Sequence, residues 1–470
     1  MFCYSSRCAS DPPNRVVFWK DDIDFMLLQS THLFFQKNRI FVLFGIMAIL
    51  FVFVGQLQSW NLSLAILNLC LISAIMTLGA NIQWGYAGIV NFGIMGFAAL
   101  GGLAGVLVSM PPVEAGWQAG GMGLLGGGVV IVLTSFLAVF VWSRIKHITR
   151  WRYWMMTAVI LSGYLVMRAI VDPAVEAIES IESAKAGHIG GLKLPILVSW
   201  VVGGIFAAGA AYVIGRISLG LRSDYLAIAT LGISEIVIYV LKNEDWLARG
   251  VKNVNGLPRP VPYEIDLQAE QWVIDLADQL GADIPELSSV IVKLSYAGLF
   301  TIVLLVLFWL FETALRSPWG RMMRAIRDNE VAANAMGKHV TAKHLQVFVL
   351  GSAVVGLAGA MLTTLDGQFT PASYLPLRFT FLIWIMVIVG GSGNNFGSIL
   401  GGFVIWFFWI ESEPLGLWLM DVITAPLSET SMLREHLLAS AAHMRLMTMG
   451  LLMLLMLRFA PQGLIPETKR

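Results

Sequence analysis

The sequence predicts an all-α fold: a polytopic membrane helical bundle with about ten to twelve crossings, some of them broken or re-entrant helices. Three observations support this fold. First, only 13% of the 470 residues are charged and 57% are hydrophobic, whereas soluble proteins contain about 25% charged residues. Second, twelve apolar runs follow one another along the chain. Third, the loops between these runs divide into basic and acidic ones.

The apolar runs set the expected crossings, because a spanning helix needs about 20 residues. They fall near 40–55, 62–79, 84–110, 122–141, 153–170, 195–214, 225–241, 291–312, 345–366, 379–391, 396–411 and 440–458. Most of them are long enough to cross a bilayer. The run 379–391 is short, and we expect it to form one half of a broken helix.

The charges of the loops predict the orientation, since loops rich in Lys and Arg remain in the cytoplasm. The loop 142–152 has four basic residues and no acid, and the loop 316–344 has six basic residues and two acids, so both are expected inside. The loop 172–194 has four acids and two lysines, and the stretch 262–290 has seven acids and no basic residue, so both are expected outside. With twelve crossings, both termini lie in the cytoplasm.

The chain is expected to form one membrane domain, residues 39–466, after a polar cytoplasmic N-terminal tail, residues 1–38. Because polar residues fill this tail, no cleavable signal peptide is expected in it. The three cysteines, Cys3, Cys8 and Cys70, form no disulfide framework.

Two polar segments are expected on the outer face, the external loop 242–290 and residues 412–436. The first should contain a short amphipathic helix within 262–290. Its acidic residues form either a plain solvated surface or a docking surface for a solute-binding protein. The sequence leaves both interpretations open.

Residues 79–105 combine eight glycines with polar side chains in a stretch expected at membrane depth. Glycine lets membrane helices approach closely, and Gly101 with Gly105 forms a small-xxx-small pattern. An interrupted helix at this depth is tolerated only where it is buried in protein or lines a cavity. The residues here that we expect to line a solute pathway are Asn81, Trp84, Tyr86 and Asn91.

The apolar run 225–241 carries two further pathway candidates, Thr230 and Glu235. An ionised carboxylate at the bilayer centre costs about 3 kcal/mol or more unless it is paired or hydrated. Glu235 therefore either faces a hydrated route through the bundle or is a protonated group hydrogen-bonded to a neighbouring helix.

The loop 316–344 is predicted to contain a capped helix from Ser317 to Gly337. Ser317 can cap the helix, Pro318 fits its first position, and Gly337 suits the left-handed residue after its last turn. An apolar face at helical spacing consists of Trp319, Met322, Met323 and Ile326, and a basic stripe consists of Arg321, Arg324 and Arg327. Such a helix is either held by another protein or lies on the membrane surface.

A family resemblance favours the first interpretation. Within this loop, the string Glu330-x-Ala332-Ala333-x-x-x-Gly337 resembles the EAA-type loop of ABC importer permeases, whose cytoplasmic coupling helix docks into the ATP-binding subunit. Gly320, Arg321, Ala325, Ile326 and Arg327 extend the likeness to the LivM or UrtC type of permease, from the branched-chain amino acid and urea importers. The residues thereby implied in coupling to the ATPase are Arg321, Arg324, Ala325, Arg327, Glu330, Ala332, Ala333 and Gly337.

Other segments resemble the same family in the same order, namely 79–86, 225–236, 255–260, 390–397 and 461–464. The resemblance covers roughly residues 60–110 and 215–466. Residues 111–214 depart from it, because two apolar spans and a polar loop enlarge this region, and the N-terminal 38 residues have no counterpart in it.

The resemblance implies a transport subunit rather than an enzyme. This subunit would sit in the bacterial inner membrane and conduct branched-chain amino acids or a related small polar solute such as urea or an amide. The implied partners are a second homologous permease, two ATP-binding cassette subunits, an external solute-binding protein and the lipid bilayer. No cofactor is expected on this chain, since ATP and Mg²⁺ would bind the partner subunits.

The motifs that the sequence lacks agree with this. Gly337-Lys338 is followed by His339 rather than by the Ser or Thr of a P-loop. The sequence also contains no H-E-x-x-H motif and no paired-Cys metal site. Neither a catalytic site nor a metal site is therefore expected. No feature points to nucleic acid. An alternative is an ion-coupled secondary transporter with Glu235 as the coupling carboxylate, which should show inverted repeats that the sequence does not reveal. A third hypothesis, a non-transporting scaffold, is disfavoured by the glycine and polar residues at membrane depth.

Overall fold

The computed structural model describes residues 38–144, 149–181, 187–426 and 431–467, and most of these are helical. Among them, nine helices are long and apolar enough to cross a membrane, or ten if the bent pair Met432–Ala439 and Met444–Phe459 is one span. The expected all-α membrane bundle is therefore confirmed, at the lower end of the expected number of crossings. The expected N-terminal tail lies outside the described residues, except for residue 38.

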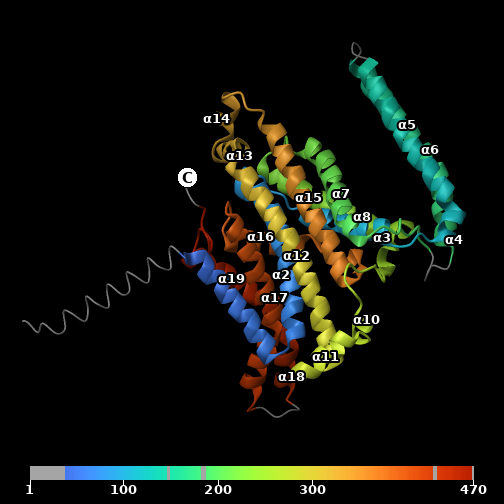
Figure 1. Cartoon of the computed structure of the whole chain (residues 1–470). Helices are drawn as coiled ribbons and strands as arrows, with labels where there is room; N and C mark the ends of the chain where they lie inside the picture. The colour runs from blue at the N-terminus through green and yellow to red at the C-terminus, as the bar shows by residue number, and fades with distance from the viewer. Residues whose placement is uncertain (1–37, 145–148, 182–186, 427–430, 468–470) are drawn as a thin grey trace, which may run out of the picture.

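The bundle is organised around α15, which packs against α2, α3 and α7 (Figure 1). The long helices are Asn38–Leu57, α2 (Trp60–Asn81), α5 (Met122–Arg144), α6 (Thr149–Glu179), α7 (Ile196–Ser218), α8 (Ser223–Asn243), α12 (Ile284–Arg316), α15 (Val340–Asp366) and α17 (Asn395–Thr424). The shorter apolar ones are α3 (Ile94–Ser109), α16 (Pro376–Gly390) and α19 (Met444–Phe459), and α19 follows α18 (Met432–Ala439).

Glycines bring the central helices into backbone contact. A Cβ atom on Gly101 of α3 would lie 1.8 Å from the carbonyl oxygen of Gly356 in α15, and one on Gly359 would lie 2.0 Å from that of Ala98. No larger side chain fits such distances, so the small residues at these positions set the spacing of α3 and α15. The close packing expected of Gly101 is confirmed.

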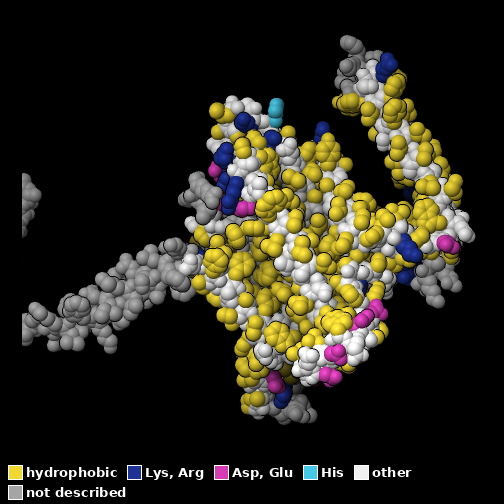
Figure 2. Space-filling view, in the orientation of Figure 1, with side chains coloured by type: hydrophobic (Ala, Val, Ile, Leu, Met, Phe, Trp, Pro, Cys, Tyr) yellow, Lys and Arg dark blue, Asp and Glu magenta, His cyan; other side chains and the backbone are white. Residues whose placement is uncertain are grey.

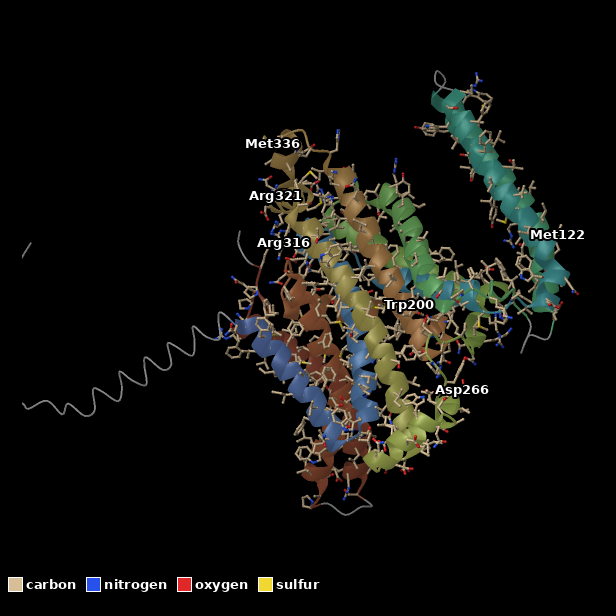
Figure 3. All side chains as sticks on the ribbon, viewed as in Figure 1. Met122, Trp200, Asp266, Arg316, Arg321 and Met336 are labelled. Atoms are coloured by element: carbon tan, nitrogen blue, oxygen red, sulfur yellow. The ribbon has the colours of Figure 1, made fainter. Side chains whose placement is uncertain are left out.

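The two ends of the bundle are distinct (Figures 1 and 3). One end, called here the α13 end, carries the short helices α13 (Pro318–Asp328) and α14 (Glu330–Ala335). The opposite end, called the α11 end, carries α10 (Glu264–Gln268) and α11 (Gln271–Leu280). Figure 2 shows Lys and Arg gathered at the α13 end and Asp and Glu along α10 and α11. The amphipathic helix expected within 262–290 is α11, because Val273 and Ala277 are buried and its acids are exposed.

Two long helices are each followed by a break and a short helix, and these two sets of elements are called here the interrupted crossings. α2 continues into a π-helical turn, η1 (Ile82–Tyr86), and the chain is irregular from 87 to 93 before α3 begins. α15 is likewise followed by β2 (Gln368–Phe369), which pairs with β1 (Val254–Asn255), and by η4 (Pro371–Ser373) before α16 begins. α3 and α16 have 16 and 15 residues, too few to span a hydrocarbon core of about 30 Å. The run 379–391, which was expected to form one half of a broken helix, is the short helix α16.

The two short helices run in opposite directions. Gly105, near the end of α3, packs against Leu257 beside β1, at the α11 end. Gly391, directly after α16, packs against Ile465 at the α13 end. A long helix, a break and a short helix therefore occur twice with opposite polarity, an arrangement that inspection of the sequence does not reveal.

α5 and α6 form a hairpin that stands apart from the rest of the described chain (Figures 1 and 2). Apolar side chains cover it on all sides, as on a helix pair surrounded by lipid. Its base is held through α4 (Glu114–Gly116), η2 (Trp117–Gly121) and α9 (Asp245–Ala248), which η3 (Gly250–Lys252) follows. There the carboxylate of Glu179 accepts a hydrogen bond of 3.2 Å from the backbone N–H of Trp246.

The first part of the segment 412–436, which was expected on the outer face, is helical, because α17 continues through Pro414 to Thr424. The polar groups there have partners within the bundle. Gln58 donates a hydrogen bond of 2.8 Å to Glu411, and Arg445 forms an ion pair with Glu413. A helix can therefore extend through this stretch, beside η5 (Ser440–His443).

Candidate functional site

The helix at the α13 end begins as the sequence predicts. Ser317 Oγ accepts a hydrogen bond of 3.2 Å from the backbone N–H of Trp319, and Pro318 occupies the first helical position. Met323 and Ile326 are buried against the bundle. α13 therefore lies with its apolar face on the rest of the chain.

The expected single helix from Ser317 to Gly337 is wrong, because the loop breaks at Asn329. This residue is extended, with φ −156° and ψ 96°, and its side chain accepts a hydrogen bond of 2.9 Å from the backbone N–H of Ala332. Asparagine is a strong N-cap, so it ends α13 and starts α14. Gly337 has φ +76°, as expected for the residue that ends a helix.

The tip of the loop, residues 328–337, projects from the α13 end (Figure 3). Of the residues proposed for coupling, Ala325, Glu330, Ala332 and Gly337 are exposed, whereas Ala333 is half-buried. Val331 and Met336 are each 80% exposed. Sequence analysis missed these two residues, although a valine beside Ala332 and a methionine before Gly337 are apolar residues in a polar loop. Together they give the tip an apolar surface without a partner on the described chain.

The basic stripe does not act as one unit. Arg321 is exposed, whereas Arg324 donates a hydrogen bond of 3.3 Å to the carbonyl oxygen of Leu315, near the end of α12. Arg327 points inward and donates a hydrogen bond to the carbonyl oxygen of Gly85. Arg321 also donates a hydrogen bond of 3.4 Å, to the carbonyl oxygen of Arg316, so all three arginines bind the chain itself and Arg321 is the one that is exposed.

Arg327 joins three segments that sequence analysis singled out separately. It contacts Gly85 in η1, and its guanidinium forms an ion pair of 3.0 Å with Glu467. The C-terminal segment pairs in turn with the end of α16, where the backbone N–H of Ile465 donates to Gly390 at 2.9 Å. Burial would lower the pKa of Arg327, but the hydrogen bonds and charges of Glu467 and Asp328 raise it. The guanidinium therefore stays charged and ties α13 to both interrupted crossings.

Asn81 and Asn91 are buried and hydrogen-bonded. The Asn81 side chain donates to Asn395 at 3.3 Å and accepts from the backbone N–H of Gly393 at 3.0 Å. Asn91 donates to Gln83 at 2.9 Å, and Gln83 donates to the carbonyl oxygen of Phe348 at 2.9 Å. These amides hold the irregular segment 82–93 between α15 and the start of α17.

The aromatic and hydroxyl candidates are also packed. Trp84 stacks on Trp384 of α16 with ring centroids 4.7 Å apart, and Tyr86 is buried. Trp384 Nε1 donates to the carbonyl oxygen of Asn91 at 3.1 Å. Thr230 accepts a hydrogen bond of 3.0 Å from the backbone N–H of Phe92. The break before α3 is therefore fastened to α8 and α16.

Glu235 lies apart from these residues. It lines an open groove of about 500 Å³ between α8, α16, α17 and α19, together with Arg378. The guanidinium of Arg378 lies 4.9 Å from the ring centroid of Trp409 and forms no ion pair with Glu235 in the part of the chain that the structure describes. Both interpretations of Glu235 assumed a carboxylate remote from cations, and the fold instead brings a basic residue of α16 into the same groove.

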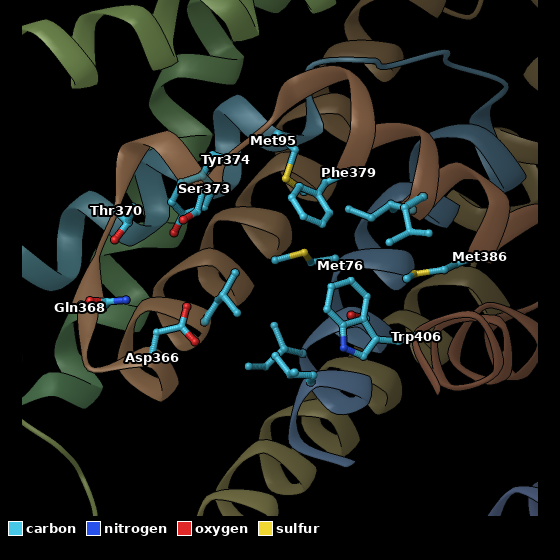
Figure 4. A pocket seen from close by; sticks show the side chains of 16 residues that line it. Met76, Met95, Asp366, Gln368, Thr370, Ser373, Tyr374, Phe379, Met386 and Trp406 are labelled. Atoms are coloured by element: carbon cyan, nitrogen blue, oxygen red, sulfur yellow. The ribbon is translucent and has the colours of Figure 1, made fainter. Parts of the chain in front are cut away.

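A second cavity, of about 240 Å³, lies between α2, α3, α15, α16 and α17 (Figure 4). Polar residues from the end of α15 and the turn after it form one side, and methionine and aromatic residues form the other. None of the pathway residues expected from the sequence lines it. The polar residues missed are Asp366, Gln368, Thr370 and Ser373. Their signal in the sequence is a polar stretch between the apolar runs 345–366 and 379–391.

Comparison with known proteins identifies a family and several relatives of this chain. Residues 153–457 match the model of a family described as branched-chain amino acid transport system, permease component. The match includes α6 and α7, so the expected departure over 111–214 holds at most for its first part.

Three curated relatives illustrate the similarity. The high-affinity branched-chain amino acid transport system permease protein LivM of Escherichia coli is 28% identical over 270 residues, 57% of each chain. The probable branched-chain amino acid transport permease protein LivM of Methanocaldococcus jannaschii is 25% identical over 398 residues, 84% of this chain and 90% of its own length. The related LivH of Escherichia coli is 23% identical over 135 residues, 29% of this chain and 41% of its own. The chain thus spans little more than half the length of the first of these. No solved structure matches it significantly.

Proposed function

Because the chain belongs to the family of permease components of branched-chain amino acid transport systems, we propose that it is one transmembrane subunit of an ABC importer. In this role it forms, with a second permease, the pathway for branched-chain amino acids, and partner ATPase subunits drive transport. The relatives of LivM and LivH type support a pairing of two related permeases. Family membership disfavours the ion-coupled alternative, although the two interrupted crossings of opposite polarity would also suit a secondary transporter.

The observation that carries this proposal is the exposed tip of the loop at the α13 end. Val331, Ala332 and Met336 form a small apolar surface on helices that project from the bundle. Exposed apolar patches in polar surroundings mark protein interfaces. We assign this tip as the coupling helix that docks into an ATP-binding subunit, with Glu330 and Gly337 at its two ends.

Arg327 explains how movement of the tip reaches the membrane segments. A displacement of α14 is transmitted to α13. Arg327 then transmits it to Gly85 in η1 and to the C-terminal segment on α16. From η1, the hydrogen bonds of Asn91 and Trp384 continue the path between the two breaks. These packed residues therefore act as hinge and gate contacts and do not line the solute pathway. They are Asn81, Trp84, Tyr86, Asn91 and Thr230.

The orientation follows from the same docking. The α13 end, with its basic residues, faces the cytoplasm and the ATPase, and the acidic α11 end faces outward. An external solute-binding protein would deliver the solute to that outer face, where α10 and α11 are available for contact. ATP and Mg²⁺ bind the partner subunits, so this chain needs no cofactor of its own.

The experiment that tests the proposal is Ala332→Asp in the co-expressed importer. Ala332 is exposed, whereas Ala333 is half-buried, so a change at 332 disturbs the permease less. Aspartate in the first turn of α14 also suits the helix dipole, so the loop should keep its fold. We expect the variant permease to insert and to pair with its sister subunit, but to lose co-purification of the ATPase and ATP-driven uptake by at least tenfold. Normal ATPase binding together with normal uptake would contradict the coupling role.

A further inference from the structure

The cavity of Figure 4 lies where the two interrupted crossings meet. Met76 of α2 and Met95, the second residue of α3, belong to the first interrupted crossing. Asp366, at the end of α15, and the turn from Gln368 to Tyr374 belong to the second. Both interrupted crossings therefore line one cavity, and the coupling loop contacts both of them through Arg327 and its partners.

Its polar side is an anionic site. Asp366 is the last residue of α15 and is exposed, and its carboxylate forms no ion pair or hydrogen bond with another described residue. The carbonyl groups at a helix C-terminus carry partial negative charge, which adds to the attraction for a cation. Gln368, Thr370 and Ser373 follow within the next turn and bring hydrogen-bonding groups to the same side.

The opposite side is apolar and adaptable. Met76, Met95 and Met386 reach the cavity from three different helices, and Phe379 and Trp406 lie beside them (Figure 4). Methionine is unbranched and polarisable, so it fits aliphatic groups of different shape. A volume of about 240 Å³ lies just below the range of about 300–1,000 Å³ found for drug-sized ligands, as a site for a smaller molecule should.

Among the buried polar side-chain atoms that have no hydrogen-bond partner in the part of the chain that the structure describes, two belong to residues of this cavity. They are the hydroxyl oxygen of Thr370 and the indole Nε1 of Trp406. Buried donors and acceptors are nearly always hydrogen-bonded, so these two atoms indicate a polar occupant.

We propose that this cavity holds the solute on its way through the subunit, and that the solute it fits is a zwitterionic amino acid with a branched aliphatic side chain. The ammonium group of the solute pairs with Asp366. Its carboxylate accepts a hydrogen bond from the Thr370 hydroxyl, and its side chain packs against Met76, Met95 and Met386. This proposal rests on the importer function proposed above. It separates the two solute classes of the family resemblance, because urea has no ammonium group to form an ion pair with Asp366 and no aliphatic side chain to pack against the methionines.

The test uses the complete importer, with its binding protein, in ATP-loaded proteoliposomes and with radiolabelled leucine as the probe. Asp366→Asn should lower leucine uptake at least tenfold in complexes whose assembly is verified by co-purification. Glu114→Gln is the matched control, because Glu114 is an exposed acid on α4, away from the cavity and from the outer helices α10 and α11. Its uptake should equal that of the wild type.

A second pair of variants tests the apolar side and remains informative if Asp366→Asn fails to assemble. Met386→Ala enlarges the cavity, so uptake of phenylalanine relative to leucine should rise at least threefold. Met361→Ala truncates an equally buried methionine that does not line the cavity, and it should leave this ratio unchanged. The binding protein is the same in every sample, so a change in the ratio belongs to the permease.

The outcomes separate the two proposals. If the wild-type importer takes up no leucine, or takes up urea instead, the importer function proposed for branched-chain amino acids and this inference both fail. If the wild type transports leucine, but Asp366→Asn equals Glu114→Gln and Met386→Ala equals Met361→Ala, only the cavity proposal is overturned.

Discussion

Arg327→Ala isolates the link between the coupling loop and the membrane segments. The substitution leaves the buried carbonyl oxygen of Gly85 without its donor, which costs about 1–3 kcal/mol. The ion pair with Glu467 adds less, about 1 kcal/mol at most, because the two side chains are 24% and 29% exposed and therefore partly screened. A loss of about 2 kcal/mol changes the ratio of attached to detached loop about 30-fold.

The assay compares leucine uptake with ATP hydrolysis in the same proteoliposomes. Since Arg327 faces the bundle rather than the tip, the ATPase should still bind and hydrolyse ATP, but the uptake per ATP hydrolysed should fall at least tenfold. Lys343→Ala is the control, because the half-buried Lys343 side chain hydrogen-bonds, within the described part of the chain, only Gln346 on its own helix, at 3.2 Å. An unchanged uptake per ATP in Arg327→Ala would refute the idea that this residue transmits the movement.

Three further predictions test the fold, the orientation and the energy source. Gly101→Ala should lower the melting temperature of the purified permease, because overpacking between helices costs about 1–3 kcal/mol. Gly298→Ala is the control and should not lower it, since a Cβ atom there meets nothing within 4 Å. Equal melting temperatures of the two variants would contradict the contact between α3 and α15. A cysteine that replaces Asp278 should react with an impermeant maleimide added outside intact cells, whereas a cysteine that replaces Met336 should not. The reverse labelling pattern would show that the orientation is opposite to the one proposed. Uptake into ATP-loaded proteoliposomes should persist with a protonophore present, while its collapse would favour ion coupling through Glu235.

Local signals in the sequence predict the local structure well. The cap at Ser317, the helix-ending Gly337 and the close contact of Gly101 all depend on neighbouring residues or on the size of one side chain, and the structure confirms each. The same rules could have predicted the helix break at Asn329, because asparagine is a preferred N-cap. The apolar and basic residues at helical spacing favoured one continuous helix instead.

The site could not be predicted in the same way, because its residues come together only in the fold. Arg327 meets Gly85 and Glu467 across 242 and 140 positions of the sequence, so its inward direction is invisible in a basic stripe. Polar residues at membrane depth, such as Asn81 and Asn91, were expected to face a pathway, yet their side chains hydrogen-bond other buried side chains of this chain.

The measurement that tests the central claim most directly is cross-linking from the tip of the coupling loop. Met336→Cys, labelled with a photoactivatable benzophenone, carries the probe at a position that is 80% exposed at the α13 end. In the co-expressed importer, irradiation should join the permease to an ATP-binding subunit, and a cysteine at exposed Asp278 on α11 should not give this product. A probe at Met336 that labels only lipid or water, in complexes that contain the ATPase, would contradict the account.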